Sequence, residues 1–293
     1  MDFEGRKIQK TEKINGILKQ YLPEESGKEA LLCEAMNYSV AVGGKRIRPM
    51  LLLESYEMFG GRDTAADPFA AALEMIHTYS LVHDDLPAMD NDMYRRGQLT
   101  THAKYGEAMG VLAGDGLLNY AFEVMSDAVC EQGAKAAKAM AILAKKAGVR
   151  GMIAGQTVDL AWTGKPQTRE LLDYINERKT SALLCGALMA GAALAGAKDS
   201  ELDLLEQIGN YVGLAFQIKD DILDVVGDEA KLGKPLHSDE KNEKSTYVTL
   251  IGIEKAEETV REFSNRAVEL LDTLPYKNEF LKNLLLSLIT REY

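Results

Sequence analysis

Seventeen consecutive residues, 181–197 (SALLCGALMAGAALAGA), carry no charged side chain. A helix that is apolar on every side has to be enclosed by other helices or by lipid. Alanine and glycine dominate the stretch, so it is only weakly hydrophobic, and it falls short of the roughly 20 strongly apolar residues that a membrane-spanning helix needs. We therefore expect the central helix of a large α-helical bundle and no integral membrane segment.

The remaining sequence is dominated by the helical period, and glycine or proline residues separate its apolar segments. It contains no convincing run of alternating β-branched residues and no Ser/Gly linker. We therefore predict an all-α fold that forms a single domain over residues 1–293. The predicted helices cover residues 27–41, 48–59, 67–85, 108–130, 134–147, 168–178, 180–195, 200–224, 252–273 and 279–289.

Charge and cysteine content narrow the possible function classes. The net charge of −11 is the opposite of the basic footprint that is typical of nucleic-acid binding. The cysteines Cys33, Cys130 and Cys185 are scattered and form no CxxC pair, which is typical of a reduced compartment. The charged first residues lack the apolar region of a secretory signal. We expect a cytoplasmic protein that does not bind nucleic acid.

Four aspartates fall within residues 81–97 (LVHDDLPAMDNDMYRRG), directly after an apolar helical stripe. Pro87 cannot continue that helix, because it lacks an N–H donor and its ring clashes with the preceding turn. The chain should bulge there and bring Asp90 back beside Asp84 and Asp85. Converging carboxylates suit a hard divalent cation, and magnesium is held by carboxylates together with substrate phosphates. A solvated helix end remains the alternative for Asp84 taken alone.

A second group of carboxylates lies in residues 216–224 (FQIKDDILD). Asp220 and Asp224 are four residues apart and share one helical face, and Asp221 lies beside them. Apolar residues on either side indicate a partly buried helix, so its carboxylates predict a second metal-binding cluster. An exposed amphipathic turn remains the alternative for this segment alone. Two such clusters, each at the end of an apolar helix, are stronger evidence for metal binding than either cluster alone.

Three cations follow a Gly-Gly break in residues 43–49 (GGKRIRP). The segment is not a Walker loop, because Lys45 lacks the following Ser or Thr. Taken alone, it would be a basic surface patch. Together with Arg95 and Arg96, in a chain of negative net charge, it predicts diphosphates that are bound partly by metal and partly by Arg and Lys side chains. The arginines are then expected to hold diphosphates and not to neutralise the aspartates.

These motifs resemble those of the trans-prenyltransferases, the farnesyl diphosphate synthase family, and of its bacterial members above all. The landmarks occur in the family's order: GGKRIRP, HTYSLVHDDLPAMDNDMYRRG, GQTVD at 155–159, KT at 179–180, FQIKDDILD, and LGK…D…KSTY at 233–247. The resemblance runs from about residue 25 to the end of the chain. It implies the isoprenoid synthase fold, which is a helical bundle around a deep central cavity, and a homodimer.

The resemblance also implies a role for each candidate site residue. Three magnesium ions on an allylic diphosphate would be held by Asp84, Asp85, Asp90, Asp220 and Asp224, with support from Asp221, Gln156 and Asp159. The allylic diphosphate would also be contacted by Arg95 and Lys234. Isopentenyl diphosphate would be bound by Lys45, Arg48, His77 and Arg96. The residues near the reacting carbons would be Lys179, Thr180 and Gln217, and the catalytic set would be Asp84, Asp85, Lys179, Thr180, Gln217 and Asp220.

Such a reaction needs both cations and a dry cavity. A diphosphate leaves only when metal ions and cationic side chains neutralise its charge. An allylic carbocation then remains, and an apolar cavity keeps water from quenching it. The double bond of isopentenyl diphosphate attacks this cation and a proton is lost; the resemblance implies that the released diphosphate takes this proton. The chain departs from the family pattern at Met93, Arg178, Ser181 and His237, none of which is a predicted metal ligand.

Product length is expected to depend on the residues just before the first aspartates. In the family these positions limit the growing chain, and here they are Tyr79 and Ser80. A tyrosine about one helical turn below the carboxylates would form the floor of the pocket. This favours the fifteen-carbon farnesyl diphosphate, with the twenty-carbon geranylgeranyl diphosphate as the alternative product. Core packing alone remains the alternative role for Tyr79.

Other functions fit the sequence less well. A class I terpene cyclase normally carries a mixed Asn/Ser/Glu second motif where this chain has DDILD. The pair His83-Asp84 would suit an HD phosphohydrolase, but the four histidines are badly spaced for one. A noncatalytic subunit of a heteromeric prenyl synthase usually loses an aspartate motif, and both motifs are present here.

Overall fold

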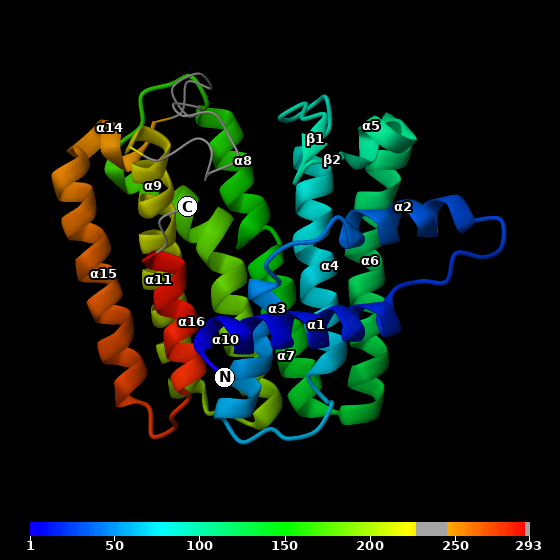
Figure 1. Cartoon of the computed structure of the whole chain (residues 1–293), viewed down its shortest axis with the longest axis horizontal. Coiled ribbons are helices and arrows are strands. Elements are labelled where there is room, and N and C mark those ends of the chain that lie inside the picture. The colour runs from blue at the N-terminus through cyan, green and yellow to red at the C-terminus, as the bar shows by residue number, and fades with distance from the viewer. Residues whose placement is uncertain (227–244, 291–293) are drawn as a thin grey trace.

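The computed structural model describes residues 1–226 and 245–290, which form an almost entirely helical molecule (Figure 1). The predicted site residue Lys234 and the variant position His237 lie outside the described residues. The described helices are α1 (Phe3–Tyr21), α2 (Ala30–Ala41), α3 (Ile47–Met58), α4 (Asp67–Asp84), α5 (Thr101–Tyr105), α6 (Glu107–Gln132), α7 (Ala134–Ala147), α8 (Met152–Trp162), α9 (Arg169–Asn176), α10 (Ala182–Ala195), α11 (Asp199–Val226), α14 (Tyr247–Ile251), α15 (Ile253–Thr273) and α16 (Glu279–Ile289). A short hairpin joins β1 (Tyr94–Arg95) to β2 (Gln98–Leu99). The all-α prediction is confirmed.

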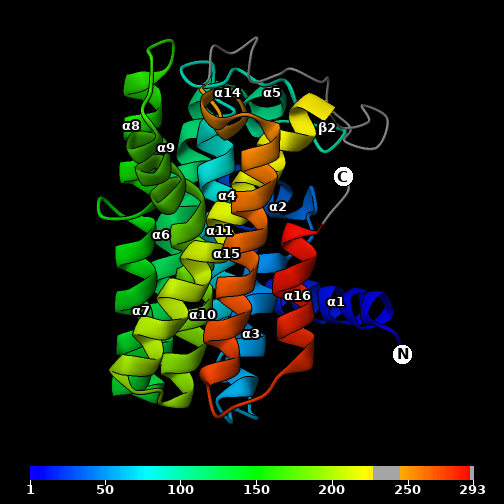
Figure 2. The same ribbon diagram turned by 90° about the vertical axis from the view of Figure 1, so that its left-hand side faces the viewer.

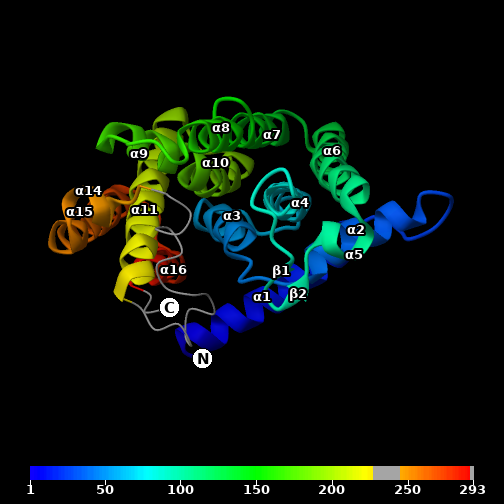
Figure 3. The same ribbon diagram turned by 90° about the horizontal axis from the view of Figure 1, so that it is seen from above.

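Helix α10 is the centre of the bundle. Its residues are buried from Ala182 to Leu194, and it packs against α3, α7 and α11, which lie around it when the molecule is seen from above (Figure 3). Close packing requires glycine here, because a Cβ at Gly191 would lie 2.1 Å from the carbonyl oxygen of Leu52 in α3. The prediction of a buried central helix is confirmed, and no helix among the described residues is long and apolar enough to cross a membrane.

Helices α1, α5, α8 and α14 were not predicted from the sequence. Helix α1 lies across the upright helices (Figure 1) and buries only Ile14, Ile17 and Leu18. Helices α5 and α14 span five residues each, which is too short to show a helical period. Helix α8 buries only Met152 and Gly155. A helix with so little buried surface leaves only a weak apolar pattern in the sequence.

The predicted break between helices 168–178 and 180–195 was wrong. The chain runs from α9 through a π-helical turn, η1 (Glu177–Ser181), directly into α10. A π-turn accommodates an extra residue without ending the helix, and such turns are frequent at functional sites. The turn carries Lys179 and Thr180, so the unexpected geometry falls on two of the predicted site residues.

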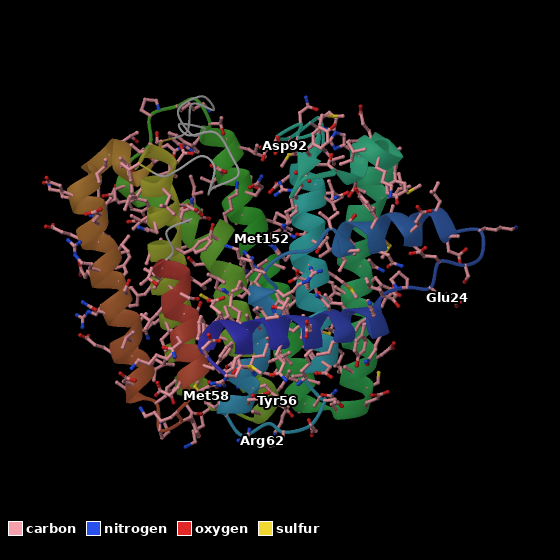
Figure 4. All side chains as sticks on the ribbon, in the orientation of Figure 1. Glu24, Tyr56, Met58, Arg62, Asp92 and Met152 are labelled. Carbon is pink, nitrogen blue, oxygen red and sulfur yellow. The ribbon has the colours of Figure 1, made fainter. Side chains whose placement is uncertain are left out.

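The charged ends of two helices lie at the same end of the molecule. Helices α4 and α11 both finish at the upper end of the views in Figures 1 and 2, and the β1–β2 hairpin lies at that same end. Asp92 marks this end in Figure 4, whereas Tyr56 and Arg62 mark the opposite one. The two aspartate groups are therefore gathered at one end of a tightly packed bundle.

Candidate active site

The chain turns back on itself directly after α4. Asp84 is the last residue of the helix, and the backbone N–H of Asp90 donates to its carbonyl oxygen at 2.8 Å. The N–H groups of Met89 and Asn91 both donate to the carbonyl oxygen of Leu86, and Asn91 adopts a left-handed conformation. The loop after Pro87 thus returns Asp90 to the helix end, as the position of the proline led us to expect.

Asp84 is held in place by α8. Nε2 of Gln156 donates to Oδ1 of Asp84 at 2.7 Å. Burial raises the pKa of Asp84 to about 6; the nearby Lys179 opposes this rise, and Asp90 adds to it. A carboxylate that is partly desolvated beside a second carboxylate is stabilised when a cation binds to it. The supporting role predicted for Gln156 agrees with this contact.

Asp85 already has a cationic partner. Its side chain is 3% exposed, and Arg95 of β1 donates to both of its oxygens, from Nη2 at 2.6 Å and from Nε at 2.9 Å. The prediction that the arginines do not neutralise the aspartates was therefore wrong for Arg95. The physical reason is burial, because a carboxylate this far from water requires a partner and the hairpin brings a guanidinium within reach.

The π-turn η1 presents its polar side chains to two neighbouring helices. Nζ of Lys179 donates to Oδ2 of Asp159 in α8 at 2.6 Å, and Oγ1 of Thr180 donates to Oε1 of Gln217 in α11 at 3.3 Å. The turn is held between two glycines. A Cβ at Gly155 would lie 2.2 Å from the backbone N of Lys179, and one at Gly213 would lie 2.2 Å from Oγ of Ser181.

This fit leads to a prediction for Gly155. Replacing it by alanine places a methyl group against backbone that cannot rotate away, so the turn must shift. A displacement of about 1 Å near reacting groups can lower a rate by about 100-fold, and we expect a loss of that order in kcat. Overpacking should also lower the free energy of unfolding by about 1–3 kcal/mol. Steady-state kinetics and thermal melting would measure both effects.

Gly16 of α1 provides the control for this substitution. It is also a helical glycine, but a Cβ there would meet nothing within 4 Å. Gly16→Ala should stabilise the protein by about 0.5–1 kcal/mol, because alanine loses less backbone entropy on folding, and it should leave kcat unchanged. Wild-type turnover in Gly155→Ala would show that the tight contact at η1 has no catalytic importance.

The second aspartate group lies at the end of α11. Asp221 and Asp224 are buried, at 4% and 2% exposure, and Asp220 is partly buried. Oδ1 of Asp221 accepts from Nε2 of Gln217 at 3.3 Å, and its Oδ2 accepts from the backbone N–H of Tyr247 at 2.8 Å. Asp221 therefore orients Gln217 and anchors the start of α14, and its expected support of the metal cluster stays a prediction.

The donor atoms at these two helix ends suit magnesium in their chemistry. The candidate ligands are carboxylate oxygens, which a hard cation prefers over nitrogen or sulfur. Within residues 1–226 and 245–290, no group of three or more His, Cys, Asp or Glu side chains is already arranged to hold a metal ion. The ligand set Asp84, Asp85, Asp90, Asp220 and Asp224 therefore stays a prediction, and it requires Asp85 to exchange Arg95 for the cation.

The other predicted cations surround a cavity of about 780 Å³ beside α4. Its walls include four of the predicted isopentenyl-diphosphate residues and the predicted catalytic Thr180: Lys45, Arg48, His77, Arg96 and Thr180. Residues of α1 and α16 also line this cavity. A smaller hollow, also bordered by His77 and Arg96, reaches Asp85 and Arg95. The structure thus brings Lys45, Arg48 and Arg96 close to the end of α4.

Arg48 and His77 form a defined pair in this cavity. Nη1 of Arg48 donates to Nε2 of His77 at 3.2 Å, which requires that nitrogen to be unprotonated. Burial and then the neighbouring arginines, Arg48 first, lower the pKa of His77 well below its ordinary value. Burial also lowers the pKa of Arg48 to about 10. The cavity therefore offers a cationic guanidinium supported by a neutral imidazole.

The proposed pocket floor is buried as well. Tyr79 is 5% exposed, and its ring stands edge-on to the ring of His83, with 5.8 Å between the ring centroids. Among the described residues its hydroxyl has no hydrogen-bond partner, and burial raises its pKa to about 12. Oγ of Ser80 donates to the backbone carbonyl of His77 at 2.8 Å. These contacts leave the role of Tyr79 in product length as a prediction.

Sequence reasoning missed the partner of one cation in GGKRIRP. Arg46 does not line up with Lys45 and Arg48 as a further ligand, because its guanidinium is buried against Glu74 of α4. The available signal was Glu74 itself, an acid that follows an apolar run in α4 and stands one turn before His77.

Comparison with known proteins gives consistent matches over nearly the whole chain. A family model described as polyprenyl synthetase matches residues 29–275. The farnesyl diphosphate synthase of Micrococcus luteus is 42% identical over 275 residues, which cover 94% of this chain and 93% of that protein. The geranylgeranyl diphosphate synthase of Cyanophora paradoxa is also 42% identical, over 90% of this chain and 91% of its own. A crystal structure of a Helicobacter pylori geranyltransferase, complexed with magnesium and isoprenyl diphosphate, matches with a TM-score of 0.84 at 34% identity, over 99% of this chain and 97% of that one.

Proposed function

The chain belongs to the polyprenyl synthetase family and is a trans-prenyl diphosphate synthase, and we propose that its product is farnesyl diphosphate. It would condense isopentenyl diphosphate head to tail with dimethylallyl diphosphate and then with geranyl diphosphate. The observation that carries the proposal is the cavity lined by Arg48, His77 and Arg96, next to the aspartates that end α4. One end of the bundle would thus hold two diphosphates, one on metal and one on cationic side chains.

Each part of the site has a task in this reaction. Bound magnesium would neutralise the charge of the leaving diphosphate. The five aspartates of the two motifs would hold the metal. Arg95 would turn from Asp85 to the allylic diphosphate, and Lys45, Arg48, His77 and Arg96 would hold isopentenyl diphosphate. Thr180 and Gln217, already hydrogen-bonded to each other, would lie beside the reacting carbons together with Lys179. The released diphosphate would accept the proton.

The proposal is tested by supplying labelled isopentenyl diphosphate, magnesium and one allylic diphosphate at a time, and by sizing the products. We expect elongation of dimethylallyl and geranyl diphosphate to fifteen carbons. A chelator should abolish the reaction and added magnesium should restore it, because charge neutralisation of the leaving group supplies several kcal/mol of the barrier reduction. Failure to elongate any allylic substrate would contradict the proposed activity and would instead favour a noncatalytic subunit.

Product length is the part of the proposal that similarity supports least. Relatives named as farnesyl diphosphate synthases are 42% and 45% identical to this chain, and relatives named as geranylgeranyl diphosphate synthases are similarly close, at 42% and 43%. Support for the shorter product comes from the large buried side chain of Tyr79, which lies one turn before the carboxylates on α4. Geranylgeranyl diphosphate is the alternative product.

Three further expectations belong to this proposal. They are a homodimer, a cytoplasmic location and three magnesium ions in each site. The exposed apolar side chains of Val111 and Leu112 on α6 support burial of that helix against a second copy. Light scattering of the purified chain would measure its mass in solution, and a monomer at micromolar concentration would exclude the homodimer.

A further inference from the structure

The loop before α3 carries Lys45 and leads into the helix that carries Arg48, and one buried arginine ties this loop to its surroundings. Arg46 lies immediately before α3 in a left-handed conformation, with φ of 49°, and is 6% exposed. Its Nη1 donates to Oε1 of Glu74 at 2.7 Å, its Nε to Oδ1 of Asn15 at 2.9 Å, and its Nη2 to the carbonyl oxygen of Val40 at 2.7 Å. One side chain thus ties the loop to α1, α2 and α4.

Glu74 is the buried anion of this arrangement. It is 3% exposed and lies one helical turn before His77, the residue that accepts from Arg48. Burial lowers the pKa of both Arg48 and Arg96, and Glu74 opposes that effect in each case. A buried carboxylate beside several guanidinium groups keeps them charged and limits their repulsion.

Arg96 depends on the same loop for its position. It adopts a left-handed conformation with φ of 52°, and a Cβ at Gly44 would lie 2.6 Å from its Nη1. The guanidinium therefore packs directly on the Gly44 backbone, two residues before Arg46. A shift of the loop would displace Lys45 and the start of α3, on which Arg48 lies, and would remove the surface on which Arg96 rests.

We propose that the buried Arg46–Glu74 pair is a positioning element for the cations Lys45, Arg48 and Arg96, and that it sets the affinity for the diphosphate of the metal-independent substrate. Both residues also border the cavity of about 780 Å³, but the pair is bonded internally and to α1 and α2, so it acts through those cations. The inference deepens the proposed function and rests on it for the identity of the substrate. A buried pair adds little net stability, since desolvation opposes its attraction, so its position beneath the cation loop indicates a role in geometry.

The test compares Arg46→Met/Glu74→Gln with wild type. The double variant removes both charges, which avoids leaving one of them buried without a partner. We expect the KM for isopentenyl diphosphate to rise about tenfold, which is the lower end of the loss found when groups that orient binding residues are removed. The KM for geranyl diphosphate should stay within about twofold, because that substrate is held mainly by metal. Arg46→Lys keeps the charge but cannot make all three contacts. Its KM for isopentenyl diphosphate should lie between those of wild type and the double variant.

Lys10→Met/Glu54→Gln is the matched control, because it likewise removes both charges of an ion pair whose carboxylate is buried. Lys10 joins α1 to Glu54 of α3 by an ion pair that does not involve the cation loop. This control variant should leave both KM values unchanged even if it weakens the packing of α1. Equal rises in both KM values of the double variant, together with a fall in Tm, would mean that the pair is merely structural and would overturn the proposal.

A binding measurement separates this inference from the proposed activity. Calorimetry with inorganic diphosphate in the presence of a chelator reports the metal-independent site without any turnover. We expect wild type to bind diphosphate and the double variant to bind it about tenfold more weakly. Equal binding, or no binding by wild type, would overturn the positioning role. Binding that weakens as expected in a chain that elongates no allylic substrate would refute the proposed function and leave the positioning role supported.

Discussion

Replacing Asp84 by asparagine is expected to lower kcat by about a thousandfold while the protein stays folded. The substitution removes one negative charge from the end of α4 but keeps the size of the side chain, so Gln156 can still donate to the new carbonyl oxygen. Loss of a group that stabilises charge in a water-excluded site lowers rates by about 100- to 1,000-fold. Single-turnover kinetics with geranyl diphosphate and a magnesium titration would measure the loss.

Stability should not fall in this variant. Burial raises the pKa of Asp84 to about 6, so the folded state disfavours the ionised carboxylate at pH 7 relative to the unfolded chain. Removing the charge removes that penalty, and Tm should stay level or rise. Asp203→Asn, at an exposed position on α11, provides a control of equal charge change and should keep wild-type activity. A normal kcat for Asp84→Asn would exclude a metal-binding role for this carboxylate.

Tyr79→Ala is expected to shift the products from fifteen carbons to twenty or more. Removing the ring opens space below the carboxylates, which a longer hydrocarbon chain can fill. The same change should lower the free energy of unfolding by about 3–5 kcal/mol, as large-to-small changes at aromatic core positions do, so products should be sized at a temperature well below the variant's Tm. Reverse-phase chromatography of the dephosphorylated products would give the chain lengths.

Tyr79→Phe is the matched control for this experiment. It keeps the ring and removes only a buried hydroxyl that has no hydrogen-bond partner among the described residues. Phenylalanine should therefore leave product length unchanged and should not reduce stability, since an unsatisfied buried polar group is unfavourable. Fifteen-carbon products from Tyr79→Ala would show that the tyrosine only packs in the core and that the floor lies elsewhere.

The helical period predicted most of the bundle because most of its helices bury a continuous apolar face. Helix α10 was the clearest case, since an uncharged run of Ala, Gly and Leu is stable only inside other helices. Helix α1 was missed for the converse reason, because it crosses the bundle and buries only a few side chains. The π-turn at Glu177–Ser181 was missed because it is set by the fit of Lys179 against Gly155, a contact between distant segments.

The sequence by itself determined which chemical groups are available and how they are spaced along each helix. Spacing on one helix is local, so Asp84 had to follow His77 on α4, and Pro87 had to end that helix. Only the tertiary structure decided the partners: Arg95 with Asp85, and Arg46 with Glu74 instead of a substrate. The physical reason is that a buried charge takes whichever opposite charge the packing brings within reach, and packing between segments distant in sequence has no local period from which it could be predicted.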